Sequence, residues 1–397
     1  MMCYTLPMQT LTLRCTLKPT PEQAAALLAT VQLFAEGCNH ALRVAKERGE
    51  FRRFKLHHLV YRDLRAMGLS ANLAVQAIAR VGRKKGSRAK LYQPTSCAFD
   101  QRTLSLRKED ETVSLTTVAG RLVIPLKLGN YQRGVLARAR SVQGGVLTEG
   151  PKGKWYIHLS LRVETPEPPT GGGKVVGVDL GQKALATLST GVQFSSGSLK
   201  GKRLHYLRKR AEVRSRLDRE RTRGLRRLWE RLGGRERRFV NHTLHTVARR
   251  IVDSLNPGDT LAIEELTGLR GRTTQRGREN RHLHHLWPYG RFRALLEYKA
   301  ALRGVRVVAV DPRDTSKTCS RCGHCDRANR RSQALFRCTA CGYQDNADRN
   351  AALNIAQRAG SMGMGRCKPA PILRVSSLHC PSLESPRLPG TPWRGGG

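Results

Sequence analysis

Over residues 10–45 the hydrophobic pattern is first that of a β-strand and then that of an α-helix. Leucine and cysteine alternate with threonine and basic residues over 10–18 (TLTLRCTLK), which is the period of a half-buried β-strand. Thr20 follows as a helix N-cap that opens a capping box, and apolar residues then recur at helical spacing to Ala45. The pattern over 56–81 predicts more helix, interrupted near Gly68.

From residue 96 the pattern changes to short strands. Two of them flank a polar turn as in a hairpin, and a later pair joins through a glycine-containing turn. The predicted strand segments are 103–107, 111–115, 122–126 and 146–163. A strand, a helical insert and then more strands predict a small β-barrel that carries a helical insertion.

A proline- and glycine-rich stretch at 165–173 has the composition of a linker, and a different pattern follows it. The apolar strand 174–181 (KVVGVDLG) ends in a carboxylate, and 184–194 is its expected antiparallel neighbour. We expect the aperiodic tail 361–397 to be disordered. The remaining predicted elements are helices at 199–231, 239–255, 287–303 and 349–359, and strands at 260–266 and 304–310.

The charge balance indicates a polyanionic partner. The 397 residues include 72 Lys and Arg against 30 Asp and Glu, a formal net charge of +42. A hydrophobic content of 39% can build real cores, which excludes a disordered polycation and makes nucleic acid the expected partner. The stretch 200–238 holds 17 basic and five acidic residues, which favours a helix that faces nucleic acid over a solvated face.

Neither a membrane span nor a secretory signal is apparent. No apolar run reaches the roughly 18 residues that a span needs, and 1–15 lack the charged and apolar regions of a signal peptide. We therefore expect a cytoplasmic protein with no membrane partner and no small-molecule substrate.

Four cysteines have the spacing of a zinc site. Two C-x2-C pairs can present four thiolates in the tetrahedral arrangement that Zn²⁺ prefers, and a site closed by four thiolates is structural rather than catalytic. Cys325 is a fifth, unmatched thiol, which is either a spectator or a substitute for Cys322. The histidines within 282–285 could ligate a metal, but we expect them on a loop surface or against nucleic acid and assign them no role. The four predicted zinc ligands are Cys319, Cys322, Cys338 and Cys341.

Three carboxylates lie in or beside apolar segments, which is an unusual place for acidic residues in so basic a chain. Asp179 ends the strand VVGVD, Glu264 lies in LAIEEL and Asp348 lies in ADRNAALNI. Carboxylates that converge from separate elements can hold two Mg²⁺ ions. One ion can activate a water while the other stabilises the leaving oxygen of a phosphodiester.

Spacing alone leaves alternatives at these positions. Glu265 competes with Glu264, because adjacent strand residues point to opposite faces. Asp345 competes with Asp348 in the same way. The DLG triplet at 179–181 also resembles the phosphate loop of actin-like ATPases.

The segment 315–359 resembles the C-terminal signature of the TnpB family, the transposon-encoded RNA-guided DNA nucleases related to type V CRISPR effectors. The elements TS-x-TCS-x-CGH, F-x-C-x2-CG and D-x-NAA-x-NI occur in order and at the family's spacing. Three upstream segments also resemble the family: the start at 10–45, GVDLG at 177–181 and AIEEL at 262–266. The resemblance therefore covers residues 10–359.

This resemblance implies a RuvC-like catalytic triad of Asp179, Glu264 and Asp348. It favours Glu264 over Glu265 because the family's strand ends in Glu, an acidic residue and Leu, and Asp348 over Asp345 because the catalytic Asp precedes x-N-A-A. It also maps the family's zinc thiolates onto Cys319, Cys322, Cys338 and Cys341.

The implied fold is α/β and multidomain. An RNase H-like (RuvC) nuclease domain would carry an inserted zinc-ribbon module, and an N-terminal wedge β-barrel would carry a helical recognition insertion. The expected parts are the wedge β-barrel at 1–19 and 96–164, the recognition lobe at 20–95, the linker at 165–173, the RuvC-like domain at 174–314 and 345–360, the zinc-binding module at 315–344 and the disordered tail at 361–397.

The implied function is that of an Mg²⁺-dependent, RNA-guided DNA endonuclease. It would hydrolyse DNA phosphodiesters by a two-metal mechanism after recognising a short transposon-adjacent motif and a guide-complementary target. The expected partners are a guide RNA from the transposon end and double-stranded target DNA, in a monomeric ribonucleoprotein of a prokaryotic cytoplasm that joins the nucleoid when bound to DNA. The alternatives are a nuclease-inactive RNA-guided repressor, a transposase or its accessory protein, and an actin-like ATPase.

Overall fold

The computed structural model describes residues 8–83, 91–169, 173–181, 183–265, 287–332 and 334–361. Contacts divide the chain into two units, with the boundary between Glu164 and Thr165, and each unit is described by itself. The predicted tail beyond Ser361 and the histidines of 282–285 lie outside the described residues. No helix within the described ranges has the length and apolar character to cross a membrane.

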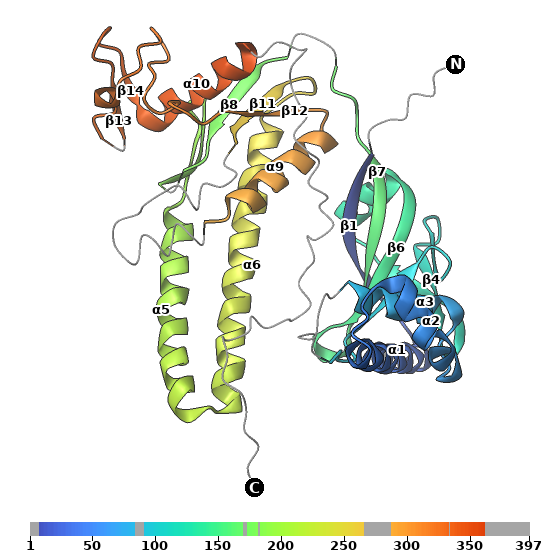
Figure 1. Ribbon diagram of the computed structural model, residues 1–397. Coiled ribbons are helices and arrows are strands. Elements are labelled where there is room, and N and C mark those ends of the chain that lie inside the picture. The colour runs from blue at the N-terminus through green and yellow to red at the C-terminus, as the bar shows by residue number, and fades with distance from the viewer. Residues whose placement is uncertain are drawn as a thin grey trace. The chain divides into compact units, whose positions relative to one another are not determined.

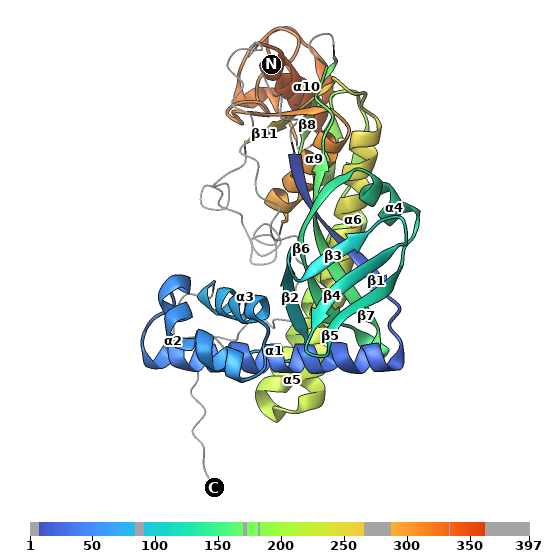
Figure 2. The same cartoon turned by 90° about the vertical axis from the view of Figure 1, so that its right-hand side faces the viewer.

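The first unit is built on a seven-stranded antiparallel sheet in the order β2-β6-β7-β1-β5-β4-β3 (Figures 1 and 2). Alternate residues of β1, namely Leu13, Cys15 and Leu17, are buried as the sequence pattern predicts. The sheet curls, because β3 returns to pack against β6, where Leu104 lies close to Gly145. The strands are β1 (Met8–Leu17), β2 (Ser96–Asp100), β3 (Leu104–Arg107), β4 (Thr112–Thr117), β5 (Gly120–Lys127), β6 (Ala139–Glu149) and β7 (Trp155–Glu164).

Three helices stand between β1 and β2, as the periodicity predicts. Thr20 closes the expected capping box, since its hydroxyl accepts from the Gln23 N–H at 3.3 Å while its own N–H donates to the Gln23 side chain at 3.1 Å. The interruption near Gly68 separates the second and third helices, and Gly68 adopts φ +96°, which favours glycine. The helices are α1 (Pro21–Glu47), α2 (Arg53–Ala66) and α3 (Ala71–Gly82); the sequence analysis did not predict a fourth, α4 (Asn130–Ala137).

The second unit contains a mixed five-stranded sheet in the order β10-β9-β8-β11-β12. The central strand β8 pairs parallel with β11, which pairs parallel with β12, while β9 and β10 run antiparallel. The segment 184–194, predicted as one strand, is two strands that fold back at Gly191, whose φ of +92° suits a tight turn. The strands are β8 (Val175–Asp179), β9 (Ala184–Leu188), β10 (Gln193–Ser195), β11 (Thr260–Glu264) and β12 (Arg306–Val310).

Helix α10 (Ala347–Ser361) lies across one face of this sheet and contacts four of its strands (Figure 1). It approaches β8 so closely that a Cβ added to Gly177 would stand 2.0 Å from the carbonyl oxygen of Ala352. Glycine at 177 therefore permits direct contact of helix and strand backbones. Ile355 of α10 packs with Val308 and Val310 of β12. Helix α9 (Tyr289–Leu302) packs against β12 and against α6 (Arg223–Asp253).

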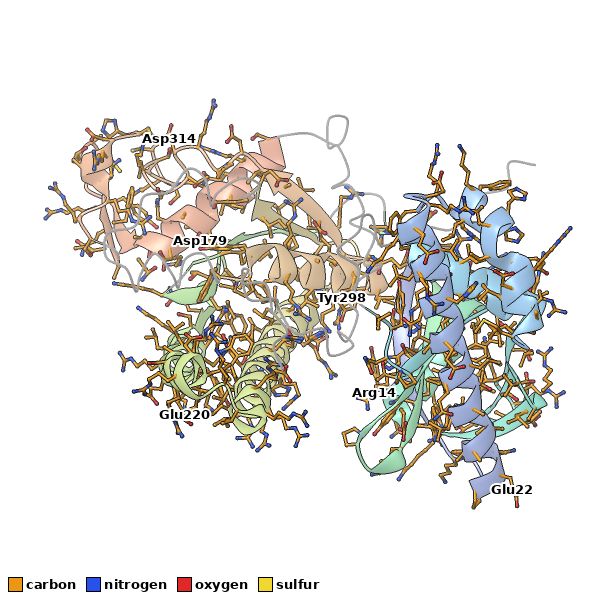
Figure 3. All side chains as sticks on the ribbon, turned by 60° about the horizontal axis from the view of Figure 1, so that its bottom comes forward. Arg14, Glu22, Asp179, Glu220, Tyr298 and Asp314 are labelled. Atoms are coloured by element: carbon orange, nitrogen blue, oxygen red, sulfur yellow. The ribbon has the colours of Figure 1, made fainter. Side chains whose placement is uncertain are left out.

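The predicted boundary between the two basic helices is wrong. The break falls at Arg221 and Thr222, between α5 (Gly197–Glu220) and α6 (Arg223–Asp253), rather than between 231 and 239. Arg221 adopts a left-handed conformation with φ 47°, and the Thr222 hydroxyl caps α6 by accepting from the Leu225 N–H at 3.3 Å. Figure 3 shows Glu220 at the end of the resulting hairpin.

Packing between the hairpin helices explains this register. Arg203 of α5 lies 3.3 Å from Glu236 of α6, and Arg210 lies 3.4 Å from the same carboxylate. Arg210 also lies 4.5 Å from the ring centre of Trp229, beside an apolar cluster. That cluster consists of Val213, Leu217, Leu225 and Leu232. Helix α6 therefore continues through Gly233 and Gly234, although glycine is a weak helix former.

Candidate active site

Two of the predicted carboxylates end neighbouring parallel strands. Val178 of β8 pairs with Ile263 of β11, so Asp179 and Glu264 occupy the next register position on adjoining strands. Both side chains are partly buried. The carboxyl ends of parallel strands meet at one edge of a sheet, which is where ligands commonly bind in α/β folds.

The third carboxylate reaches this edge from a helix. Asp348 lies in the first turn of α10, whose N-terminus is capped by Asn346; the Asn346 side chain accepts from the N–H groups of Asp348 and Arg349 at 3.0 and 3.1 Å. Because α10 crosses β8 at Gly177, its first turn brings Asp348 toward Asp179. We call Asp179, Glu264 and Asp348 the carboxylate cluster.

The charges of the carboxylate cluster act on one another. Burial, followed by the charges of Glu264 and Asp348, raises the pKa of Asp179 to about 8. Burial also raises the pKa of Glu264 and of Asp348 above their ordinary values. Partly buried carboxylates whose pKa values are raised by burial and by one another mark a candidate functional site.

Arg330 is the functional candidate that the sequence analysis missed. It follows the short helix η2 (Arg327–Asn329) within the cysteine-rich segment, and its guanidinium lies 3.4 Å from Asp348. Its charge lowers the pKa of all three members of the carboxylate cluster. No sequence signal distinguished it from the other arginines of 327–331, because its role depends on how the segment folds back onto α10.

The two alternative acids have other partners. Glu265 pairs with Arg293 of α9 at 2.7 Å. Asp345 accepts from the Tyr343 hydroxyl at 2.7 Å and pairs with Arg349 at 3.3 Å. The geometry thus groups Glu264 and Asp348, and not these neighbours, with Asp179.

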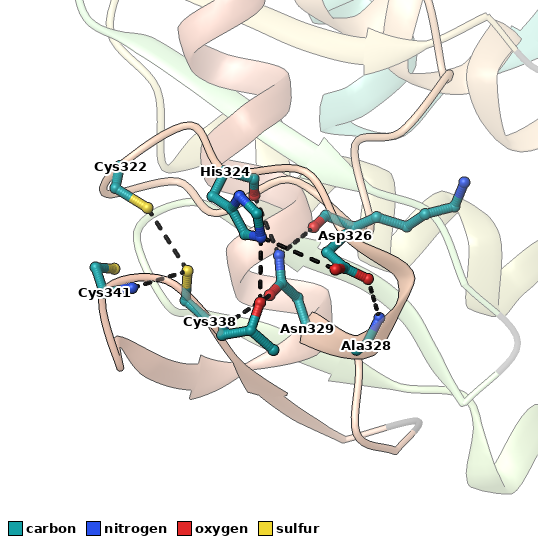
Figure 4. Close-up of polar contacts among 9 residues, drawn as sticks. Cys322, His324, Asp326, Ala328, Asn329, Cys338 and Cys341 are labelled. Atoms are coloured by element: carbon teal, nitrogen blue, oxygen red, sulfur yellow. Dashed lines mark hydrogen bonds and ion pairs between the residues drawn. The ribbon is translucent and has the colours of Figure 1, made fainter.

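The four predicted thiols form a compact group, which we call the thiolate cluster (Cys319, Cys322, Cys338 and Cys341). The sulfurs of Cys319 and Cys341 lie 3.7 Å apart. Those of Cys322 and Cys338, shown in Figure 4, lie 3.6 Å apart. A tetrahedral zinc site with Zn–S bonds of about 2.3 Å places its sulfurs about 3.8 Å apart, so the cluster fits a structural zinc ion. Cys325 is exposed and is not part of the cluster.

A buried asparagine joins the two halves of the thiolate cluster. The Asn329 amide donates to the carbonyls of Lys317 and His324 at 2.9 and 3.1 Å, on the first C-x2-C side. Its oxygen accepts from the Thr339 N–H at 2.8 Å, on the second side (Figure 4). The short antiparallel strands β13 (Leu335–Arg337) and β14 (Gln344–Asn346) flank the second pair, and β14 leads directly into α10.

The two clusters differ in compactness. Within the described residues, only the thiols have all their ligand atoms within 4.8 Å of one another. The carboxylates are more widely spaced, with Arg330 beside them.

Comparison with known proteins finds two family models that match the segments carrying the two clusters. Residues 158–267, which include Asp179 and Glu264, match the OrfB_IS605 model, described as a probable transposase. Residues 289–355, which include Arg330, the thiolate cluster and Asp348, match the model of the Cas12f1-like TNB domain. A TnpB-like protein of Methanocaldococcus jannaschii is 27% identical over 178 residues, covering 44% of this chain and 63% of that protein. This chain is a relative of the TnpB proteins.

Two further relatives carry functional names. The putative RNA-guided DNA endonuclease InsQ of Escherichia coli is 30% identical over 266 residues, covering 61% of this TnpB relative and 63% of InsQ. The CRISPR-associated endodeoxyribonuclease Cas12f1 of Sulfoacidibacillus thermotolerans is 30% identical over 226 residues, covering 53% of this chain and 52% of that enzyme. The chain thus spans between half and two thirds of the length of these curated relatives.

Proposed function

We propose that this TnpB relative is an RNA-guided DNA endonuclease and that the carboxylate cluster hydrolyses the DNA. The observation that carries the proposal is the convergence of Asp179, Glu264 and Asp348 at one sheet edge, where burial and like charge raise the pKa of Asp179 to about 8. The names of InsQ and Cas12f1, an RNA-guided DNA endonuclease and an endodeoxyribonuclease, support the same activity.

The second unit would be an RNase H-like (RuvC) nuclease domain. The mixed sheet, with antiparallel β9 and β10 on one side of β8 and parallel β11 and β12 on the other, supports this assignment. The thiolate module would then be an insertion between β12 and the last catalytic residue. In the first unit, the curled antiparallel sheet would be the wedge β-barrel, and α1, α2 and α3 the recognition insertion.

The carboxylate cluster is suited to Mg²⁺, a hard cation that prefers carboxylate oxygens. Asp179, Glu264 and Asp348 would hold two Mg²⁺ ions, which would supply an activated water and neutralise the leaving oxygen of a phosphodiester. Arg330 would favour ionisation of the three carboxylates before the metal arrives, since its charge partly offsets the rise in each pKa. The same guanidinium can pair with the scissile phosphate, for which its planar fork is well shaped.

Guide RNA and target DNA are the proposed partners. Watson–Crick pairing would supply the sequence specificity, and the protein would read a short flanking DNA motif and backbone shape. The α5–α6 hairpin supports this assignment, because many of its arginines are exposed around its surface (Figure 3). Exposed arginines of this kind bind phosphates without reading bases.

Cleavage of a target plasmid by the purified ribonucleoprotein tests the proposal. The chain provides matched pairs, because each proposed catalytic acid has a neighbour with a different partner. Glu264→Gln and Asp348→Asn should reduce the cleavage rate by more than about 100-fold, the upper range for losing a residue that merely supports a metal ligand. Glu265→Gln and Asp345→Asn should retain most of the activity.

Two outcomes would redirect the assignment. If the Asp179→Ala ribonucleoprotein cleaves the plasmid as fast as the wild type, the carboxylate cluster has no part in the mechanism. Guide-dependent DNA binding by the wild type with no Mg²⁺-dependent cleavage would instead favour the nuclease-inactive repressor.

A further inference from the structure

The loop between β12 and the first zinc-ligand pair, residues 311–320, is held along its length by one face of α10. Two asparagines of α10, four residues or about one helical turn apart, bind backbone groups of the loop. Asn350 accepts from the Ser320 N–H at 3.0 Å and donates to the Thr318 carbonyl at 2.8 Å. Asn354 donates to the carbonyls of Thr315 and Thr318 at 2.8 and 2.7 Å.

This attachment is buried and specific. Asn350 and Asn354 are almost fully buried, and each amide finds partners that a hydrophobic side chain of the same size could not supply. Ser320 directly follows Cys319 of the thiolate cluster. The α10 face therefore fixes the first zinc-ligand pair and the loop before it to the helix that carries Asp348.

The loop also reaches the carboxylate cluster. Thr315 is 3% exposed, and its hydroxyl donates to Oε1 of Glu264 at 2.6 Å. This hydroxyl lies farther, 3.1 Å, from the carbonyl of Pro312, so the ionised carboxylate is the closer and stronger acceptor. A hydrogen bond to one carboxylate oxygen restricts the rotamer of Glu264 and lets the second oxygen face a cation.

We propose that Thr315 is a positioning residue for Glu264, and that Asn350 and Asn354 link its position to the order of the thiolate cluster. The inference rests on the proposed function, because it takes Glu264 as a metal ligand. Groups that hydrogen-bond a metal ligand orient it, and losing one typically costs 10–100-fold in metal affinity or activity. The structural zinc ion thereby acts on the nuclease site without touching the DNA.

A set of threonine variants of the ribonucleoprotein tests the positioning role. Thr315→Val removes the hydroxyl at nearly constant volume, and Thr315→Ser restores it. Thr318→Val is the matched control, since the Thr318 hydroxyl donates to the Asp314 carbonyl in the same loop and not to a carboxylate. We expect Thr315→Val to raise the Mg²⁺ concentration for half-maximal cleavage by about tenfold or more, and the other two variants to resemble the wild type.

A second readout does not depend on cleavage. Ions that bind only the folded protein raise its unfolding temperature. Mn²⁺ should therefore raise the melting temperature of the wild-type ribonucleoprotein above that of Asp348→Asn, which supplies the baseline for Mn²⁺ bound elsewhere. Thr315→Val should need about tenfold more Mn²⁺ for the same rise. If the wild type shows this rise but never cleaves, the proposed function fails while the positioning role is still tested.

Hydrogen exchange tests the link to zinc. Chelation of zinc should speed amide exchange over 315–320 and reduce the Mn²⁺-dependent rise in melting temperature. Asn354→Asp, which replaces the donor amide with an acceptor, should have the same two effects with zinc still bound. The proposal is overturned if Thr315→Val matches the wild type in both metal titrations, or if Thr318→Val shifts the two titrations as much as Thr315→Val does. It is also overturned if the rate of amide exchange over 315–320 is the same with and without zinc.

Discussion

The thiolate cluster and the carboxylate cluster both lie near the N-terminal end of α10, where Ala347 packs with Cys319 and Cys338 and Asp348 occupies the first turn, but the two clusters are assembled differently. The four cysteines lie within 23 residues of one another, and their sulfurs already approach tetrahedral spacing. The carboxylates come from β8, β11 and α10, and their charges oppose one another. Four thiolates that close a tetrahedron suit a permanent structural ion. Carboxylates that are more widely spaced and repel one another suit ions that exchange and react.

Loss of one thiolate should have the largest effect. Cys338→Ser leaves three thiolates, and because binding of structural zinc supplies much of the folding free energy of such modules, the module should lose zinc and unfold. Zinc content measured by atomic absorption should fall below one ion per chain, and cleavage should disappear. Cys325→Ser is the control and should keep both; equal zinc loss in the two variants would contradict the four-ligand assignment.

Crowding at Gly177 should have the next largest effect. In Gly177→Ala the new Cβ would meet the Ala352 carbonyl and the Ala356 N–H, which are backbone groups that cannot rotate away. Helix α10 must shift, and with it Asp348. We expect the free energy of unfolding to fall by about 1–3 kcal/mol, the usual cost of overpacking, and the cleavage rate to fall by more than tenfold.

The control for this variant is Gly201→Ala. A Cβ at this exposed position of α5 meets nothing within 4 Å, and alanine is the better helix former. Chemical denaturation of the two variants should therefore give changes of opposite sign. A Gly177→Ala protein as stable and active as the wild type would show that α10 need not touch β8.

Much of both clusters could be predicted from the sequence, for reasons that differ. The C-x2-C pairs identify the zinc ligands because their geometry is local, and Thr20 is a recognisable cap for the same reason. The acids required the family resemblance, since spacing could not separate Glu264 from Glu265. Arg330, Thr315 and the break at Arg221 were not predicted, because each depends on contacts between segments far apart in the chain.

Removal of the Arg330 charge should have a smaller, pH-dependent effect. Arg330→Gln leaves the pKa of each carboxylate higher than in the wild type, so fewer are ionised at neutral pH. Cleavage should fall by about 10–100-fold at pH 7 and recover partly as pH rises. Rates measured across pH should show this shift for Arg330→Gln but not for the exposed neighbour Arg331→Gln; a uniform loss at every pH would assign Arg330 to phosphate binding instead.

A last effect, on stability alone, should appear in the protein without divalent ions at the carboxylate cluster. Asp179 has a pKa of about 8 in the folded chain, well above the ordinary value near 3.9, so the folded state binds this proton more tightly than the unfolded state. The stability that this proton contributes is complete below pH 4 and is lost as pH rises from about 4 through about 8. Mg²⁺ should restore it, because the cation replaces the proton.

The thiolate cluster should behave in the opposite way, since zinc needs deprotonated thiols and is released as pH falls. Melting temperatures of the zinc-loaded, Mg²⁺-free ribonucleoprotein at pH 6 and pH 8 separate the two clusters. Asp179→Asn, a neutral side chain of the same shape, should melt higher than the wild type at pH 8 and approach it at pH 6. If the two proteins differ by the same amount at both pH values, the buried charge of Asp179 is not what Mg²⁺ relieves.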